Sequence, residues 1–226
     1  MINVNIYSTT KNETFAEKAA YNTRVKIYGI LSKNIDLGKL GSIIDVGVTA
    51  DRTHISSNFF ENIYPNPERI TAFSDQDASW MENEYKGLKF KKGTALEMPF
   101  ENDTFDLVFS SAVIEHIGSI INQSRFIGEC FRISKKYVFI TTPNRYYPIE
   151  LHTVLPFIHW LPKNIHRKIL SIMGDGMKFF ANEENLNLLS KDNLKKLCKE
   201  NNIENFHIKT ASFLGLSSNL LLIIEK

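Results

Sequence analysis

Short apolar runs alternate with mixed polar segments along most of the chain, and this pattern predicts strands separated by helices. Apolar positions at roughly helical spacing in residues 13–35 predict one or two leading helices that end near Gly38. Residues 40–47, LGSIIDVG, form a short aliphatic run closed by Asp and Gly, which is typical of a buried parallel strand entering a turn. Later runs predict six further strands, at residues 69–73, 88–92, 105–110, 136–141, 203–210 and 216–225.

The order of these elements predicts an α/β fold. Helical patterns, the clearest at residues 122–134, separate the early strands, which is typical of a doubly wound parallel sheet with right-handed crossovers. The last two strands are joined by a segment too short for a parallel crossover, so we expect an antiparallel hairpin at the sheet edge. Residues 143–189, with several prolines, aromatics and histidines, interrupt the alternation and predict a partly helical insertion over the carboxyl end of the sheet.

Composition narrows the class of protein. The 226 residues are 43% hydrophobic and carry 27 Lys and Arg against 25 Asp and Glu, a net charge of +2. Such a chain can bury a core, which excludes wholesale disorder, and its balanced charge disfavours a nucleic-acid substrate. Cys130 and Cys198 form no metal or disulfide pattern, so we read both as buried hydrophobes. With no signal peptide and no apolar run of about 20 residues, a soluble cytoplasmic protein without an integral membrane segment is expected.

Candidate chemistry gathers where the predicted strands end, because ligands of open α/β sheets bind at that edge. Asp45 and Gly47 close the first strand, and Gly47 lets the backbone turn tightly and approach a ligand. Ser74 and Asp75 end the second strand, where an acid can hold the two hydroxyls of a ribose.

The third and fourth strands make the pattern specific. Residues 91–117 contain Gly-Thr-Ala, Met-Pro-Phe, a short acidic turn, Phe-Asp before an aliphatic strand, and then Glu115-His116. This combination resembles the class I S-adenosylmethionine-dependent methyltransferases, in the type 11 branch that contains the ubiquinone and menaquinone methyltransferases. The resemblance covers residues 40–142 and the final hairpin. It implies a Rossmann-like sheet of seven mostly parallel strands with an antiparallel C-terminal hairpin and helices on both faces.

The resemblance also implies S-adenosyl-L-methionine as the cofactor, S-adenosyl-L-homocysteine as the product, and a set of contacts to the cofactor. These are Asp45, Gly47 and Val48 for the methionine part, Asp75 or the strictly aligned Ser74 for the ribose, Gly93, Thr94 and Ala95 for the adenine, and Ser110 and Ser111 near the sulfonium. Two departures stand out: the loop after the first strand reads DVGVTAD instead of Asp-x-Gly-x-Gly-x-Gly, and Thr94 replaces an acid. Asp51 and Asn58 are the candidates to compensate.

The insertion is predicted to form the binding site for the methyl acceptor. Its turn at residues 140–146, ITTPNRY, resembles that of quinone-precursor O-methyltransferases, and its aromatic residues favour a moderately apolar or ring-bearing acceptor. An oxygen acceptor must lose a proton, and histidine is the plausible base. His116, His152 and His159 are the candidates, in that order.

No HxxxH or HExxH spacing indicates a metal, and no metal site is predicted. The basic run at residues 163–168 is read as a solvated helix face, with phosphate binding as the alternative.

These features predict a single methyltransferase domain that acts on a small-molecule or carrier-bound acceptor, with O-methylation favoured. Its parts are a leading helical cover at 1–39, a core at 40–142 and 190–226, and an insertion at 143–189 that serves as the acceptor lid. The alternatives are C- or N-methylation, and a non-catalytic cofactor-binding partner of another methyltransferase. A nicotinamide-dependent enzyme is disfavoured by the terminal hairpin and the single Gly47. The oligomeric state is left open.

Overall fold

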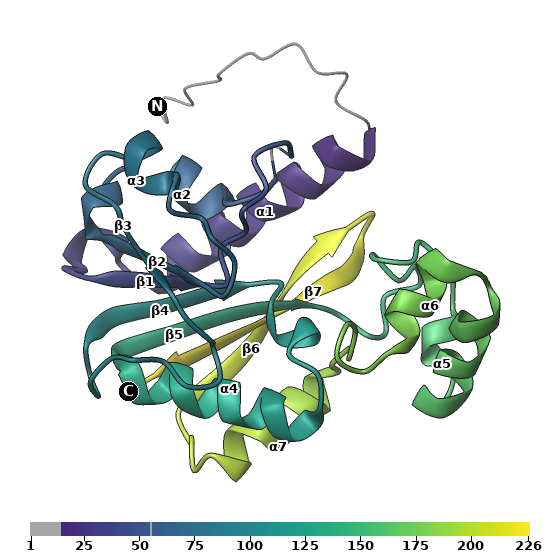
Figure 1. Ribbon diagram of the computed structural model, residues 1–226. Coiled ribbons are helices and arrows are strands. Elements are labelled where there is room, and N and C mark those ends of the chain that lie inside the picture. The colour runs from purple at the N-terminus through teal and green to yellow at the C-terminus, as the bar shows by residue number, and fades with distance from the viewer. Residues whose placement is uncertain (1–14, 55) are drawn as a thin grey trace.

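In the computed structural model, seven strands form one twisted sheet in the order β3-β2-β1-β4-β5-β7-β6 (Figure 1). The structure describes residues 15–54 and 56–226. The strands are β1 (Ile43–Val46), β2 (Ile70–Ser74), β3 (Lys89–Lys92), β4 (Phe105–Ser111), β5 (Ser134–Pro143), β6 (Phe206–Phe213) and β7 (Leu216–Glu225). The first five strands are parallel, while β7 pairs antiparallel with β5 and β6. The predicted fold class and the terminal hairpin are therefore confirmed.

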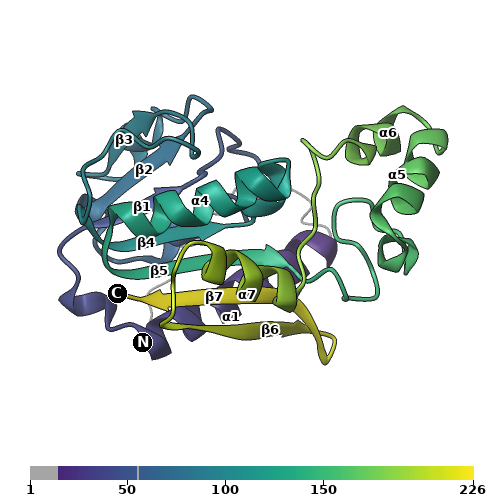
Figure 2. The ribbon, with the colours of Figure 1, turned by 90° about the horizontal axis from the view of Figure 1, so that it is seen from below.

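Helices cover both faces of this sheet, as Figures 1 and 2 show from two sides. One face carries α1 (Phe15–Asn34), α2 (Phe59–Ile63) and α3 (Met81–Glu84), and the other carries α4 (Ile120–Ile133) and α7 (Lys191–Glu200). The β4 strand serves both layers because its side chains alternate: Phe109 belongs to the core on the α1 side and Val108 to the core on the α4 side. Both side chains are fully buried.

Stacked aromatic rings make the core on the α1 side dense. The ring centroids of Phe60 and Phe109 lie 4.4 Å apart, and those of Phe109 and Phe139 lie 5.9 Å apart. These rings join α2, β4 and β5 across the centre of the sheet. The short helix α2 is therefore held close to the carboxyl ends of the central strands.

One clear difference from the predicted strand boundaries is at the start of the sixth strand. The sixth strand begins at Phe206 instead of residue 203, because Ile203 is buried in the core and its N–H donates to Cys198 O at the end of α7. Residues 74–83 form mainly a turn that leads into the four-residue helix α3. The leading helix extends over Phe15–Asn34, and the first fourteen residues of the predicted cover lie outside the described residues.

The segment between β5 and α7 leaves the sheet at the carboxyl end of β5. It contains α5 (Lys163–Ile172) and α6 (Asp175–Ala181), which pack together beside the sheet (Figure 2). Its return to the sheet is fixed by backbone bonds from Asn187 N to Glu115 O, 2.7 Å, and from Arg145 N to Leu189 O, 3.0 Å. None of the helices within residues 15–54 and 56–226 combines the length and apolarity needed to cross a membrane.

The start of α7 gives a stability prediction. Ser190 caps this helix: its Oγ accepts from Asn193 N at 3.2 Å while Asn193 Oδ1 accepts from Ser190 N at 3.0 Å. We expect Ser190→Ala to lower the free energy of unfolding by about 1 kcal/mol, because the first helical turn loses this reciprocal cap. Urea unfolding measures the change. The exposed Ser32→Ala of α1, which caps no helix, is the control and should stay within about 0.5 kcal/mol of the parent chain.

Candidate active site

A cavity of about 210 Å³ opens at the carboxyl ends of β1 and β4. In this sheet the chain passes outward in opposite directions from β1 and β4, so the cavity lies at the topological switch point. Residues from α1, the loop after β1, the start of α2 and the end of β4 line it: Arg24, Asp45, Gly47, Val48, Thr49, Ser56, Ser57, Asn58, Phe59, Ser111 and Ala112. Four residues predicted to contact the cofactor are in this set: Asp45, Gly47, Val48 and Ser111.

Gly47 gives the loop after β1 its path. Its φ is +94°, and a Cβ built there would lie 2.2 Å from Val113 Cγ2, far inside contact distance. Its N–H donates to Phe73 O at 2.7 Å, which ties the loop to the end of β2. Only glycine satisfies both the positive φ and the close approach of Val113.

Polar side chains hold the rest of the loop where the resembled family has glycines. Asn58 brackets Thr49, accepting from its N–H at 2.9 Å and donating to its carbonyl at 2.9 Å. Gln76 Oε1 accepts from Ala50 N at 3.1 Å. Asp51 accepts from Ser57 Oγ at 2.7 Å and closes the following turn. The two residues named as compensating candidates, Asn58 and Asp51, thus both fix the shape of the loop.

Two buried carboxyl groups and one arginine set the charge of the cavity. Burial raises the pKa of Asp45 from 3.8 to about 7, although the neighbouring Glu61 and the charge of Arg24 oppose the shift. Burial and the neighbouring Asp45 raise the pKa of Glu61. Burial also lowers the pKa of Arg24, which the charges of Glu115 and Asp45 oppose. The cavity therefore presents a carboxyl group beside a guanidinium.

The residues predicted for the ribose and adenine lie along the neighbouring strand ends. Ser74 is buried and its Oγ accepts from Gln76 N at 3.2 Å, while Asp75 is exposed in the turn. Gly93 N donates to Ser74 O at 2.8 Å, which places residues 93–95 directly beside the end of β2. None of these lines the cavity, so their predicted contacts with the cofactor stay predictions.

The two serines at the end of β4 differ in their environment. Ser110 is fully buried and its Oγ donates to Val46 O at 2.8 Å, so this hydroxyl braces β4 against β1 and does not face the cavity. Ser111 lines the cavity, and its Oγ accepts from Arg24 Nη1 at 3.3 Å and lies 2.9 Å from Thr141 Oγ1. Ser111 is the one of the pair placed to meet a ligand.

Two of the three candidate histidines meet beyond the end of β4. Nε2 of His116 lies 3.1 Å from Nε2 of His152, although the residues come from different segments. His152 Nδ1 donates to Glu150 Oε1 at 2.7 Å. Burial would raise the pKa of Glu150, but its bonds with His152 outweigh this and lower it to about 2. Burial lowers the pKa of His152 and Glu150 more than offsets that effect, so the net direction is upward.

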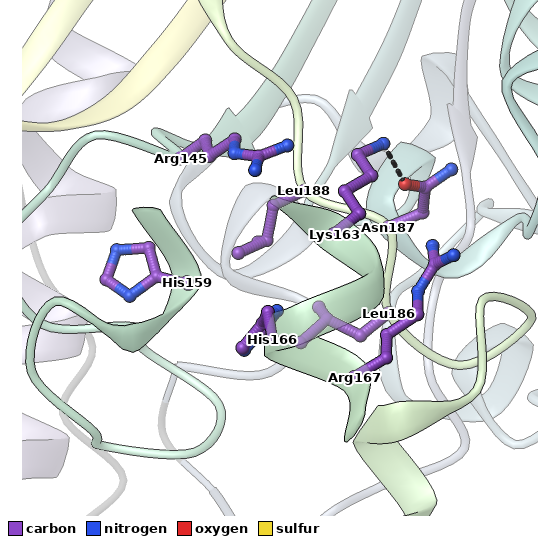
Figure 3. A pocket seen from close by; sticks show the side chains of 8 residues that line it. All are labelled: Arg145, His159, Lys163, His166, Arg167, Leu186, Asn187 and Leu188. Carbon is purple, nitrogen blue, oxygen red and sulfur yellow. Dashed lines mark hydrogen bonds between the residues drawn. The ribbon is translucent and has the colours of Figure 1, made fainter. Parts of the chain in front are cut away.

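His159 occupies a different place. It lines a basic pocket inside the insertion together with Lys163, His166 and Arg167, where the amine of Lys163 donates to Asn187 (Figure 3). Its Nε2 bonds to Tyr147 O at 2.7 Å, and burial lowers its pKa. This pocket has a volume of about 10 Å³, room for roughly one water molecule. His159 therefore lies apart from the pair formed by His116 and His152.

Arg24 and Glu61 are the charged residues at the candidate site that the sequence analysis missed. Arg24 belongs to a leading helix whose pattern predicts only a covering role, and Glu61 stands in FFENI among apolar neighbours. A buried acid between aromatic residues is unusual and is the one signal that could have singled out Glu61. No comparable signal marks Arg24.

Comparison with known proteins agrees with this geometry. Residues 59–140 match the family model described as a methyltransferase domain. A S-adenosylmethionine-dependent methyltransferase from Thermotoga maritima, described as a possible histamine N-methyltransferase, superposes with a TM-score of 0.59 at 15% identity, over 93% of this chain and 91% of that one. Magnesium protoporphyrin IX methyltransferase from Synechocystis, solved with bound SAH, gives 0.57 at 12% identity, over 97% and 91%. A search of curated protein sequences finds no match. The domain match and the shared fold agree with the predicted resemblance to class I methyltransferases.

The Asp45–Glu61 pair gives a pH prediction. Because both carboxyl groups hold their protons more tightly in the folded chain, the folded state binds more protons than the unfolded state between about pH 4 and pH 7. This pair therefore makes the free energy of unfolding fall as the pH rises across that interval. We expect Glu61→Gln to reduce the fall, measured by urea unfolding at pH 5 and pH 7.5. The exposed Glu204→Gln is the charge control. If the free energy of unfolding of Glu61→Gln falls between pH 5 and pH 7.5 as much as that of the parent chain, the assignment is contradicted.

Proposed function

We propose, from the premise that this chain carries the methyltransferase domain of the class I S-adenosylmethionine-dependent enzymes, that it methylates a small-molecule or carrier-bound acceptor. S-adenosyl-L-methionine is the donor and S-adenosyl-L-homocysteine the product. An oxygen acceptor is favoured, with C- and N-methylation as alternatives. The near-neutral charge of the chain, +2, supports a metabolite over a nucleic acid.

The observation that carries this proposal is the pairing of Asp45 and Arg24 in one cavity beside Gly47. The methionine part of the donor has an ammonium and a carboxylate group, which need an acceptor of hydrogen bonds and a cation at short separation. Asp45 supplies the first and Arg24 the second, and the guanidinium geometry suits a carboxylate. Gly47 leaves the backbone open to a close approach by the ligand.

Methyl transfer from a sulfonium depends mainly on the alignment of the donor and the acceptor. The acceptor oxygen must lie in line with the methyl carbon and the sulfur, and a cavity closed by α1 on one side supports that geometry. The hydroxyl of Ser111 and the backbone at Ala112 lie at the end of β4, between the cavity and the residues that carry His116. His116 and His152 are the candidate groups to receive the acceptor's proton, with His159 third.

The altered loop favours a working site over a non-catalytic one. In glycine-rich loops the backbone is free to adopt the required turns, whereas here Asn58 and Gln76 impose the shape through hydrogen bonds. The loop is therefore built to a defined geometry by other means. A non-catalytic partner remains the alternative that a transfer assay tests.

Cofactor binding is the first test. We expect calorimetric titration to show binding of S-adenosyl-L-homocysteine in the micromolar range, about −8 kcal/mol. Gly47→Ala should weaken it at least about 100-fold, because the added methyl overlaps Val113 and the φ of +94° is strained for alanine. Gly29→Ala of α1 is the matched control, since nothing lies within 4 Å of its Cβ position. A folded parent chain that binds neither form of the cofactor would overturn the proposal.

Methyl transfer is the second test. Label from methyl-tritiated S-adenosyl-L-methionine should pass into the low-molecular-weight or carrier fraction of a cell extract. We expect His116→Ala to lower the rate about 100-fold or more while S-adenosyl-L-homocysteine still binds, because the residue lies on the acceptor side. The exposed His207→Ala is the control. If His116→Ala transfers the methyl group at the rate of the parent chain, His116 has no part in the reaction. If the parent chain binds the cofactor but transfers no methyl group, the non-catalytic alternative is supported.

A further inference from the structure

Glu115, His116 and His152 form a compact group of potential metal ligands that the sequence spacing does not reveal. Glu115 and His116 lie in the 3-10 turn Ile114–His116 that follows β4, and His152 comes from the insertion. One ligand atom from each residue lies within 4.8 Å of the other two. Three donor atoms at such separations are close enough to bind one ion together.

The hydrogen bonds of the two imidazoles leave the same nitrogen free on each ring. His116 Nδ1 donates to the carbonyl of Asn185 at 2.6 Å, and His152 Nδ1 donates to the Glu150 carboxylate at 2.7 Å. Both partners only accept, so both Nδ1 atoms carry hydrogen. In the neutral rings the two Nε2 lone pairs then face each other at 3.1 Å, an arrangement that either a proton on one ring or a bound cation relieves.

Glu115 provides an independent observation. Its side chain is 0% exposed, and Oε2 accepts from Thr142 Oγ1 at 2.9 Å. Oε1 is buried and has no hydrogen-bond partner among the described residues. A buried carboxylate oxygen without a donor is costly, and a cation is the ligand that would satisfy it.

We propose that Glu115, His116 and His152 bind one divalent first-row transition-metal ion through a carboxylate oxygen and two Nε2 atoms. Two imidazoles and one carboxylate suit such ions and leave coordination positions open. The outer contacts are already in place, since metal-bound histidines donate their second ring N–H to a carboxylate or a backbone carbonyl. Glu150 and the Asn185 carbonyl play these parts, which makes Glu150 a positioning residue. The charges of Glu115 and Glu150 offset those of the ion.

The site also deepens the proposed function, on which this step rests. Glu115 interacts electrostatically with Arg24 of the cofactor cavity, and Ser111 and Ala112 of that cavity precede it closely in the chain. An acceptor whose oxygen binds at an open coordination position loses its proton to solvent more easily, and His116 and His152 then act as metal ligands in place of bases. That oxygen's electron pair forms the bond to the methyl carbon, and the electron pair of the broken carbon–sulfur bond stays on sulfur. The acceptor class is then a hydroxyl or phenol that can ligate a metal.

The test uses tag-free full-length protein, stripped with a chelator and dialysed, and titrated with Co²⁺ as the probe. We expect one equivalent to bind, with visible absorption bands of nitrogen- and oxygen-ligated Co²⁺ and no thiolate band from the buried cysteines. Glu115→Gln, His116→Ala and His152→Ala should each weaken binding at least 10- to 100-fold. Glu150→Gln should still bind one equivalent of Co²⁺, with an affinity about 10-fold lower, because it loses only an outer contact of His152. His207→Ala, whose side chain is exposed on β6, should bind like the parent chain.

Two outcomes overturn the proposal: no binding by the parent protein, or equal binding by the His116→Ala/His152→Ala double variant. Thermal unfolding of the parent chain with and without Co²⁺ needs no variant to fold, and an unchanged Tm at saturating Co²⁺ also counts against the site. S-adenosyl-L-homocysteine titration of the same samples separates the two proposals. Cofactor binding without metal binding leaves the proposed function standing alone, whereas metal binding without cofactor binding leaves only the metal site.

Discussion

The absence of a side chain at position 47 is the constraint on which the carboxyl edge of the sheet depends. Gly47 turns the chain away from β1 with a φ of +94° and lies against Val113. Val113 stands between Ala112, which lines the cavity at the ends of β1 and β4, and Glu115, which belongs to the proposed metal-binding group. One contact thus sets the distance between the loop after β1 and the turn after β4. Both halves of the site are positioned by the same close approach.

Arg24 is the electrostatic link between those halves. Asp45 and Glu115 are both buried, and each acts on the guanidinium of Arg24. Without this residue the edge would hold buried carboxyl groups and no nearby cation from the helix layer. The helix α1 therefore completes the site as well as covering the sheet. A stacked contact of its guanidinium over Phe59, 5.2 Å from the ring centroid, fixes the side chain against α2.

The sequence predicts the sheet well because strand order and burial follow from local pattern. Apolar runs mark strands such as the one predicted at 105–110, and the short connection before residue 216 permits only a hairpin. The cavity residues Asp45, Gly47 and Ser111 are also predictable, since they end strands. The contact of Glu61 with Asp45 is not, because it depends on how the five-residue helix α2 packs.

The cluster of Glu115, His116 and His152 shows why spacing rules miss such groups. Motifs such as HxxxH find ligands that share one helix, whereas these residues are brought together by the return path of the insertion. That path is fixed at Glu115 and His116 themselves, through Asn187 N and the Asn185 carbonyl. The insertion therefore supplies one ligand and orients another. If an acceptor ligates a cation bound at this junction, it strengthens the binding of that cation, and linkage requires the cation to strengthen the binding of the acceptor by the same factor.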